Sequence, residues 1–156
     1  MIASREPTAD RVMDHTPAEI NDTIELLTRA RIADIADRMD AIEQRLHRID
    51  HEWDIERALE SNAAIITLLC LTVGRRRRLL RYLPIAVAGF LLQHAVQGWC
   101  PPVSVFRRLG VRTMREIDRE RYALKALRGD FDDIDKDADP CTRTNAAVNA
   151  ADCSRG

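Results

Sequence analysis

The chain has 156 residues and a formal net charge of −1, and 46% of its residues are hydrophobic. That length suffices for one ordinary domain, but the apolar residues gather in the middle of the chain, which argues against an evenly built globular core. Residues 61–128 carry a net charge of +10, whereas residues 1–60 and 129–156 carry −7 and −4. The basic charge therefore lies beside the apolar segments, where it could meet anionic lipid headgroups or nucleic-acid phosphates.

The four cysteines indicate neither a zinc site nor a disulfide framework. They form no C-x-x-C pair and no cluster with histidine at ligand spacing, and they stand at Cys70, Cys100, Cys141 and Cys153. The opening residues lack an apolar run followed by a cleavage site, so we expect no secretory signal peptide. We likewise expect no bound metal and no cofactor.

The first predicted element is a long amphipathic helix over residues 16–57, preceded by a disordered segment over residues 1–15. Thr16, Pro17 and Glu19 supply a capping hydroxyl, a first-turn proline and a capping-box glutamate. Further along, apolar residues alternate steps of three and four, as in a coiled-coil seam. The expected assembly seam consists of Ile32, Ile35, Met39, Ile42, Leu46 and Ile49.

This seam has two possible partners. It could join a second copy or another protein through residues 32–53, or it could pack on the other helices of the same chain.

The second predicted element is an apolar two-helix hairpin over residues 58–112. Residues 63–73 are apolar all round, and a second apolar stretch covers residues 79–96. Both are marginal against the roughly 20 residues that a membrane-spanning helix needs. Flanking tryptophans and arginines suit a bilayer interface and favour insertion. The residues expected to bind lipid headgroups are Arg75, Arg76, Arg77, Arg78, Arg107 and Arg108.

The last predicted elements are a basic amphipathic helix over residues 113–129 and a disordered tail over residues 130–156. Thr113 and Glu116 form a second capping box at the helix start. The tail is rich in aspartate and then in small polar residues, which cannot bury a core. The predicted fold class is therefore all-α with disordered termini.

Cys100 is the candidate reactive thiol. It lies at a helix exit, with Arg107 and Arg108 a few residues on, and positive charge lowers the pKa of a thiol. A persulfide carrier or redox sensor would use such a residue, and the alternative is a small side chain packed in a tight turn. The sequence has no Gly-rich phosphate loop and no Ser-His-Asp pattern, so we expect no catalytic residues and no enzyme.

Residues 94–113 contain a Gly-x-Cys-Pro pattern followed by a Leu-Gly-[apolar]-x-Thr pattern, and an asparagine precedes the first apolar run. The matching residues are Asn62, Gly98, Cys100, Pro101, Leu109, Gly110 and Thr113. On these features residues 54–115 resemble the YgaP-like transmembrane family, small two-helix domains of the bacterial inner membrane with unknown function. Relatives are sometimes fused to a rhodanese sulfurtransferase domain. No such activity carries over, because the first cysteine of this chain is Cys70.

The leading functional hypothesis is a membrane-anchored protein of the bacterial inner membrane that acts in assembly or scaffolding through its amphipathic helix. Membrane lipids are then its first partner, and the arginine distribution places both termini in the cytoplasm. One alternative is a sulfur, persulfide or redox carrier using Cys100. Another is a soluble helical binding module with an Arg-rich patch. Nucleic-acid recognition is not expected, because the arginine run lacks interleaved aromatic residues.

Overall fold

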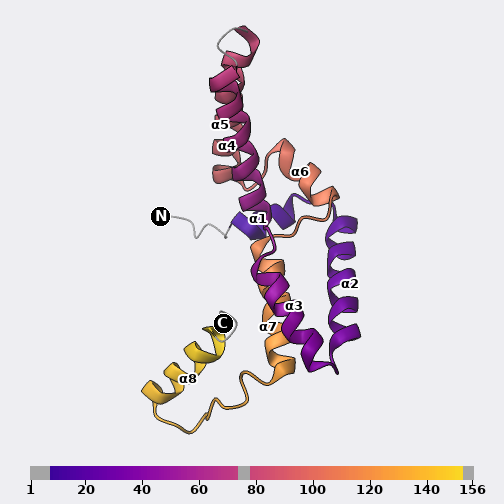
Figure 1. Cartoon of the computed structure of the whole chain (residues 1–156), viewed down its shortest axis with the longest axis vertical. Coiled ribbons are helices and arrows are strands. Elements are labelled where there is room, and N and C mark those ends of the chain that lie inside the picture. Colours follow the sequence, from indigo (N-terminus) through magenta and orange to yellow (C-terminus); the bar gives the residue numbers. More distant parts are fainter. Residues whose placement is uncertain (1–7, 74–77, 153–156) are drawn as a thin grey trace. The chain divides into compact units, whose positions relative to one another are not determined.

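A computed structural model describes residues 8–73 and 78–152, which form helices joined by turns, with no strand among them (Figure 1). The predicted all-α fold class is confirmed. The helices are α1 (Thr8–Asp14), α2 (Ala18–Ile35), α3 (Met39–Asp50), α4 (Ile55–Val73), α5 (Arg78–Gln97), α6 (Pro101–Arg108), α7 (Met114–Arg128) and α8 (Pro140–Asp152).

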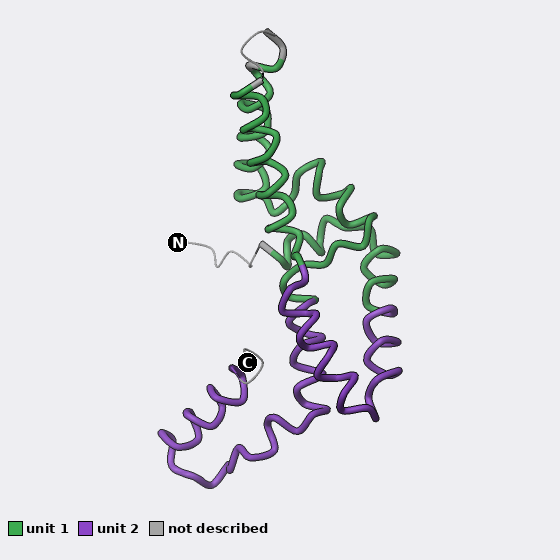
Figure 2. The backbone as a smooth tube through the Cα atoms, in the orientation of Figure 1, with its two compact units in different colours: residues 1–25, 53–116 green, residues 26–52, 117–156 purple. Residues whose placement is uncertain are grey.

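The chain forms two compact units, and each is discontinuous in sequence (Figure 2). Unit 1 comprises residues 1–25 and 53–116, and unit 2 comprises residues 26–52 and 117–156. The chain therefore passes from unit 1 to unit 2, returns to unit 1 and ends in unit 2.

The core of unit 1 joins four helices. Its buried apolar side chains come from α1, α4 and α6 and from the turn before α6, and Leu91 of α5 packs against them. The buried members are Val12, Ile55, Leu59, Cys100 and Val103. The sequence predicted disorder over residues 1–15, but α1 forms because Val12 has this core to enter.

The core of unit 2 contains most of the predicted assembly seam. Four seam residues of α2 and α3 pack with Ile117 and Leu124 of α7, and Ile32 is partly buried beside them. The four are Ile35, Ile42, Leu46 and Ile49. The remaining seam residue, Met39, is exposed. In this unit the seam therefore packs on α7, a helix of the same chain, rather than on a second copy or another protein.

The single helix predicted over residues 16–57 is divided into α2, α3 and the start of α4. Between α2 and α3 the backbone leaves the helical region, since Arg38 has φ −120° and ψ 98°. Ile35 before the break and Ile42 after it belong to the same core, so the apolar spacing continues across a point where the helix itself does not.

The tail also contains a helix, α8, where the sequence predicted disorder. The Asp139 carboxylate accepts hydrogen bonds from the backbone N–H groups of Cys141 and Thr142, at 3.0 and 3.2 Å, and Pro140 occupies the first turn. Lys125 is fully buried, and its ammonium donates to the carbonyl oxygens of Ala150 and Ala151. These contacts tie the end of α8 to α7.

No helix within residues 8–73 and 78–152 combines the length and the apolar character needed to cross a membrane. That finding contradicts the predicted transmembrane hairpin, the membrane-anchored function and the inner-membrane location. The physical reason lies in the composition of each helix. In α4 the apolar run is preceded by Glu56, Arg57 and Glu60, and α5 contains Arg81 and a polar end that includes His94.

Candidate functional site

The helices α4 and α5 lie side by side in unit 1 (Figure 1). Along each helix the less exposed residues recur on one face. On α4 this face includes the buried Ala63 and Cys70. On α5 it includes the half-buried Val87 and Leu91 and the buried His94, at steps of four and three residues. That spacing is typical of one face of a helix.

The remaining faces of α4 and α5 are apolar and exposed. Between 39% and 67% of the surface is exposed for Ile65, Ile66, Leu68, Leu69, Leu71, Tyr82, Leu83, Ile85, Phe90, Leu92 and Val96. Residues 61–73 and 82–97 contain no Asp, Glu, Lys or Arg at all. Single exposed apolar residues are normal, but a contiguous set of this kind marks an interaction site. We call this set the α4–α5 apolar surface.

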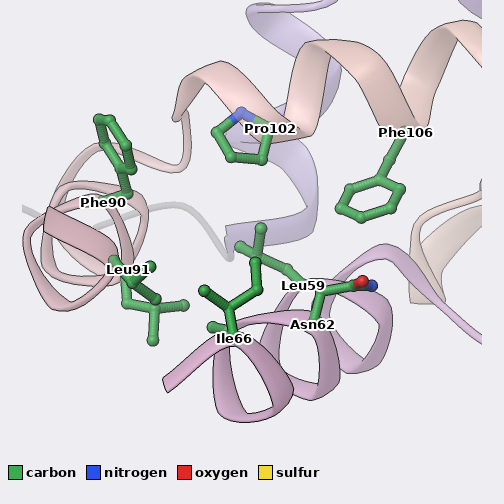
Figure 3. Close-up of a pocket in the computed structure, with 9 residues that line it drawn as sticks. Leu59, Asn62, Ile66, Phe90, Leu91, Pro102 and Phe106 are labelled. Carbon is green, nitrogen blue, oxygen red and sulfur yellow. The ribbon is translucent and has the colours of Figure 1, made fainter. Parts of the chain in front are cut away.

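A pocket of about 210 Å³ lies between α4, α5 and α6 at the edge of this surface (Figure 3). Its lining comprises Leu59, Asn62, Ala63, Ile66, Val87, Phe90, Leu91, Pro102 and Phe106. The amide of Asn62 donates a hydrogen bond of 2.7 Å to the carbonyl oxygen of Ala58, and every other lining residue is apolar. Such a pocket suits an apolar side chain or a small apolar molecule.

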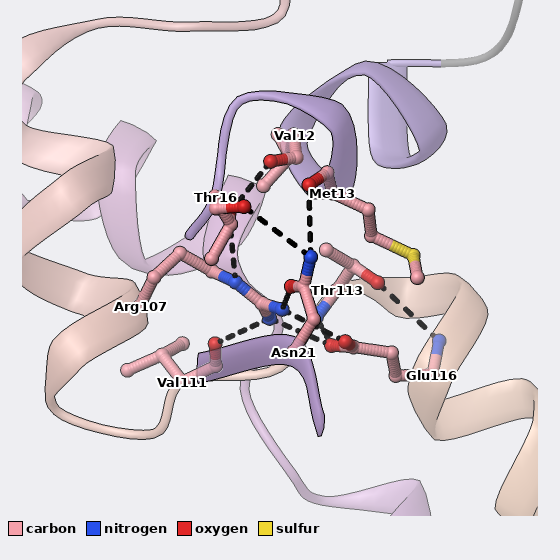
Figure 4. A network of polar contacts seen from close by, with 8 residues as sticks. All are labelled: Val12, Met13, Thr16, Asn21, Arg107, Val111, Thr113 and Glu116. Carbon is pink, nitrogen blue, oxygen red and sulfur yellow. Dashed lines mark hydrogen bonds and ion pairs between the residues drawn. The ribbon is translucent and has the colours of Figure 1, made fainter. Parts of the chain in front are cut away.

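A polar network centred on Arg107 joins α2, α6 and the start of α7 within unit 1 (Figure 4). The guanidinium is 1% exposed and donates two hydrogen bonds, of 2.7 and 2.8 Å, to the carboxylate of Glu116. It also donates to the side-chain oxygens of Asn21, at 2.7 Å, and Thr16, at 3.3 Å, and to the carbonyl oxygen of Val111, at 3.2 Å. The expected headgroup ligand Arg107 is therefore a buried structural residue.

Glu116 also completes the predicted capping box at the start of α7, which is confirmed. The backbone N–H of Thr113 donates to its carboxylate at 2.8 Å, and its own N–H donates to the Thr113 hydroxyl at 3.3 Å. Burial by itself would raise the pKa of Glu116. The hydrogen bonds from Arg107 and Thr113 outweigh burial, so the pKa of Glu116 is lowered.

Unit 2 has a second buried ionic cluster. Glu120 of α7 is fully buried, and its carboxylate accepts hydrogen bonds from Arg45 at 2.7 and 2.9 Å and from Arg31 at 3.4 Å. The basic helix predicted over residues 113–129 thus turns an acidic residue inward.

Cys100 does not have the surroundings of a reactive thiol. Its side chain is fully buried, and burial raises its pKa, whereas a nucleophilic cysteine needs a lowered pKa and access. Among the described cysteines, Cys70 is also buried and Cys141 is exposed. The geometry therefore does not favour the persulfide or redox carrier.

His94 is a buried polar residue whose environment the sequence did not reveal. It is 7% exposed, and neither ring nitrogen has a hydrogen-bond partner within the described part of the chain. Burial lowers the pKa of His94, and the nearby charge of Arg11 lowers it further, while Glu60 acts in the opposite direction. The surroundings of the ring therefore disfavour its charged form.

The residues of the predicted family motif differ widely in exposure. Thr113 and Gly98 are buried, whereas Asn62, Pro101, Leu109 and Gly110 are exposed. Gly98 and Gly110 have positive φ, of 74° and 81°. At Gly98 an added Cβ would lie 2.4 Å from the Cβ of Arg11, so this glycine is needed for the close approach of α1.

The predicted headgroup-binding arginine run, residues 75–78, falls almost entirely outside the described residues. Arg75, Arg76 and Arg77 lie outside the described residues, as does the side chain of Arg78, while Arg108 is exposed. No group of three or more His, Cys, Asp or Glu residues that could hold a metal ion occurs within residues 8–73 and 78–152.

Compared with known proteins, the chain matches no family model, no curated protein and no solved structure. The resemblance to the YgaP-like family therefore stays a prediction, and the function is inferred from the geometry alone.

Proposed function

We propose that this protein is a helical binding module whose α4–α5 apolar surface docks an apolar helical partner. The observation that carries the proposal is the exposed apolar surface itself, which extends over two adjacent helices without a charged residue in residues 61–73 and 82–97. A helix whose outer face meets only water normally carries charged residues there.

The free energy gained by burying the α4–α5 apolar surface can offset the cost of association. Complete burial of one Leu or Ile contributes about 1.5 to 3 kcal/mol. Ile85 and Leu92 are each 67% exposed, so covering each of them would contribute about 1 to 2 kcal/mol. Association costs on the order of 4 to 15 kcal/mol, so several such residues must be covered together. The α4–α5 apolar surface offers enough of them.

The pocket between α4, α5 and α6 supplies an anchor point for this partner. Binding energy at protein interfaces concentrates where a large apolar side chain fills a desolvated pocket near other contacts. Ile66 and Phe90 belong both to the pocket lining and to the exposed surface. One apolar side chain of the partner would therefore enter the pocket while its neighbours cover the outer faces.

Site-specific photo-crosslinking in cells tests the proposal. A photoreactive phenylalanine analogue is placed at Leu68 of α4 or Ile85 of α5, which are exposed members of the surface. Val148, an exposed residue of α8 in unit 2, is the matched control position. We expect a discrete protein adduct from the first two positions and none from the third.

A second variant makes the result specific. Adding Leu92→Glu should remove the adduct formed at Ile85 while the circular dichroism spectrum stays unchanged, because this side chain is exposed. Adducts no stronger than those at Val148, or an adduct at Ile85 that survives the added charge, would overturn the proposal.

A further inference from the structure

The outer face of α5 carries a second helix-packing stripe. Its members alternate steps of three and four residues and are Tyr82, Ile85, Gly89, Leu92 and Val96. At about 100° per residue these positions fall within about 80° of one another, on the side of the helix opposite Val87 and Leu91. We call these five positions the α5 outer stripe. Its spacing is the one that helices use to pack lengthwise on another helix.

Gly89 stands at the centre of this stripe, and the chain's own packing does not explain it. Nothing lies within 4 Å of the place where its Cβ would stand, and its φ is not positive. Glycine in the middle of a helix is less favourable than alanine, because it loses more backbone freedom on folding. A glycine is useful there if another backbone comes close, and the described residues supply none.

The absence of charged residues from the α5 outer stripe suits an interface between two copies of this chain. In a two-fold interface the same patch lies on both sides, so any charge near the axis meets its own like charge. Residues 82–97 contain no Asp, Glu, Lys or Arg, and His94 lies on the covered face. With Gly89 at the crossing point, the exposed Ile85 and Leu92 on either side of it become the side chains that pack on the copy.

The stripe alone is too small for a stable interface. A standard interface uses about 20 to 30 residues a side, and the stripe has five positions. Outward residues of α4, such as Ile65 and Leu68, are exposed in the same way and can complete the contact. Two α4–α5 pairs would then form a four-helix arrangement.

We infer that the partner of the α4–α5 apolar surface is a second copy of this chain, docked through the α5 outer stripe with the two helices crossing at Gly89. This inference rests on the proposed function, since it names the partner of the same surface. It also accounts for a helix-interior glycine that no contact within the described chain requires.

Sedimentation velocity of the detergent-free full chain over a range of concentrations tests the inference. The wild-type protein should sediment as a dimer. Gly89→Leu should weaken the dimer by about tenfold or more, as expected for a change at the centre of an interface. Ala88→Leu adds a side chain at an exposed position a quarter turn away and should change the dimerisation constant by less than about threefold.

Folding must be unchanged for the comparison to hold. Since nothing lies within 4 Å of the Gly89 Cβ position, Gly89→Leu should retain the wild-type circular dichroism spectrum. Gly89→Ala provides the second variant, because it favours the helix and still widens the crossing point. Its melting temperature at monomeric concentrations should rise slightly while its dimer weakens.

The outcomes separate this inference from the proposed function. A monomeric wild type that still yields a Leu92-dependent adduct with another protein at Ile85 overturns the second copy and leaves the binding module standing. A dimer that Gly89→Leu leaves intact overturns the crossing. A monomer that yields no adduct, or that instead floats with anionic phospholipid vesicles, overturns both.

Discussion

Replacing Arg107 by methionine should be among the most damaging single changes in unit 1. The guanidinium is 1% exposed and makes two hydrogen bonds to Glu116, whose side chain is 13% exposed. The change leaves that carboxylate buried without its cation, and breaking a buried ion pair from one side costs about 3 to 5 kcal/mol. Glu116 keeps the hydrogen bond from the Thr113 N–H, so we expect a loss near 3 kcal/mol.

Urea unfolding followed by circular dichroism measures this loss. With a slope of about 2 kcal/mol/M, a loss of 3 kcal/mol lowers the midpoint by about 1.5 M. The matched control is Arg108→Met, because Arg108 is the neighbouring residue on α6 and is exposed, and it should change stability by less than about 0.5 kcal/mol. Equal midpoints for the two variants would refute the structural role of Arg107.

The same pair predicts a dependence of stability on acid pH. The pKa of Glu116 in the folded state is lowered below its ordinary value of 4.5, so the folded state binds the proton more weakly than the unfolded state does. The stability from this group is fully present above about pH 4.5 and is lost as the pH falls through the lower folded pKa. Arg107→Met should remove this part of the acid sensitivity.

Three further outcomes are expected. Glu120→Leu should destabilise unit 2 by about 3 kcal/mol, since Arg45 loses both hydrogen bonds to Glu120 and retains the longer one of 3.3 Å to Glu52, and urea unfolding checks it. The pKa of His94 is lowered on folding, so the wild type should lose stability as the pH falls below 6.5, and His94→Leu should abolish that loss in melting curves from pH 5 to 7.5. In the native protein a thiol reagent should modify the exposed Cys141 well before the buried Cys100, and equal rates would contradict the burial of Cys100.

Local signals in the sequence predicted the helices best where a cap was present. The capping box of Thr113 and Glu116 placed the start of α7 correctly, because both partners of the cap lie three residues apart in the chain. Asp139 and Pro140 form an equally local signal for α8, and it could have corrected the prediction of a disordered tail.

Tertiary partners could not be predicted in the same way. The seam from Ile32 to Ile49 has the spacing of a helix that packs on another helix, but the pattern does not say which one, and Ile117 and Leu124 of α7 provide most of the cover. Arg107 looked like a residue for a lipid surface because it stands in a basic segment. Its burial depends on Asn21 and Thr16, which lie more than 80 residues away in sequence.

The alternation of the chain between its two units constrains how the protein can be made. Neither unit is encoded by one continuous stretch, since each combines residues from before and after position 53. A ribosome must therefore synthesise α7 before Ile117 and Leu124 can close the core around α3, and until then Ile42, Leu46 and Ile49 have no cover from α7. Pairings of distant segments form slowly and leave apolar surface open to aggregation during synthesis. Cutting the gene between residues 52 and 53 would give two fragments that each lack part of both cores.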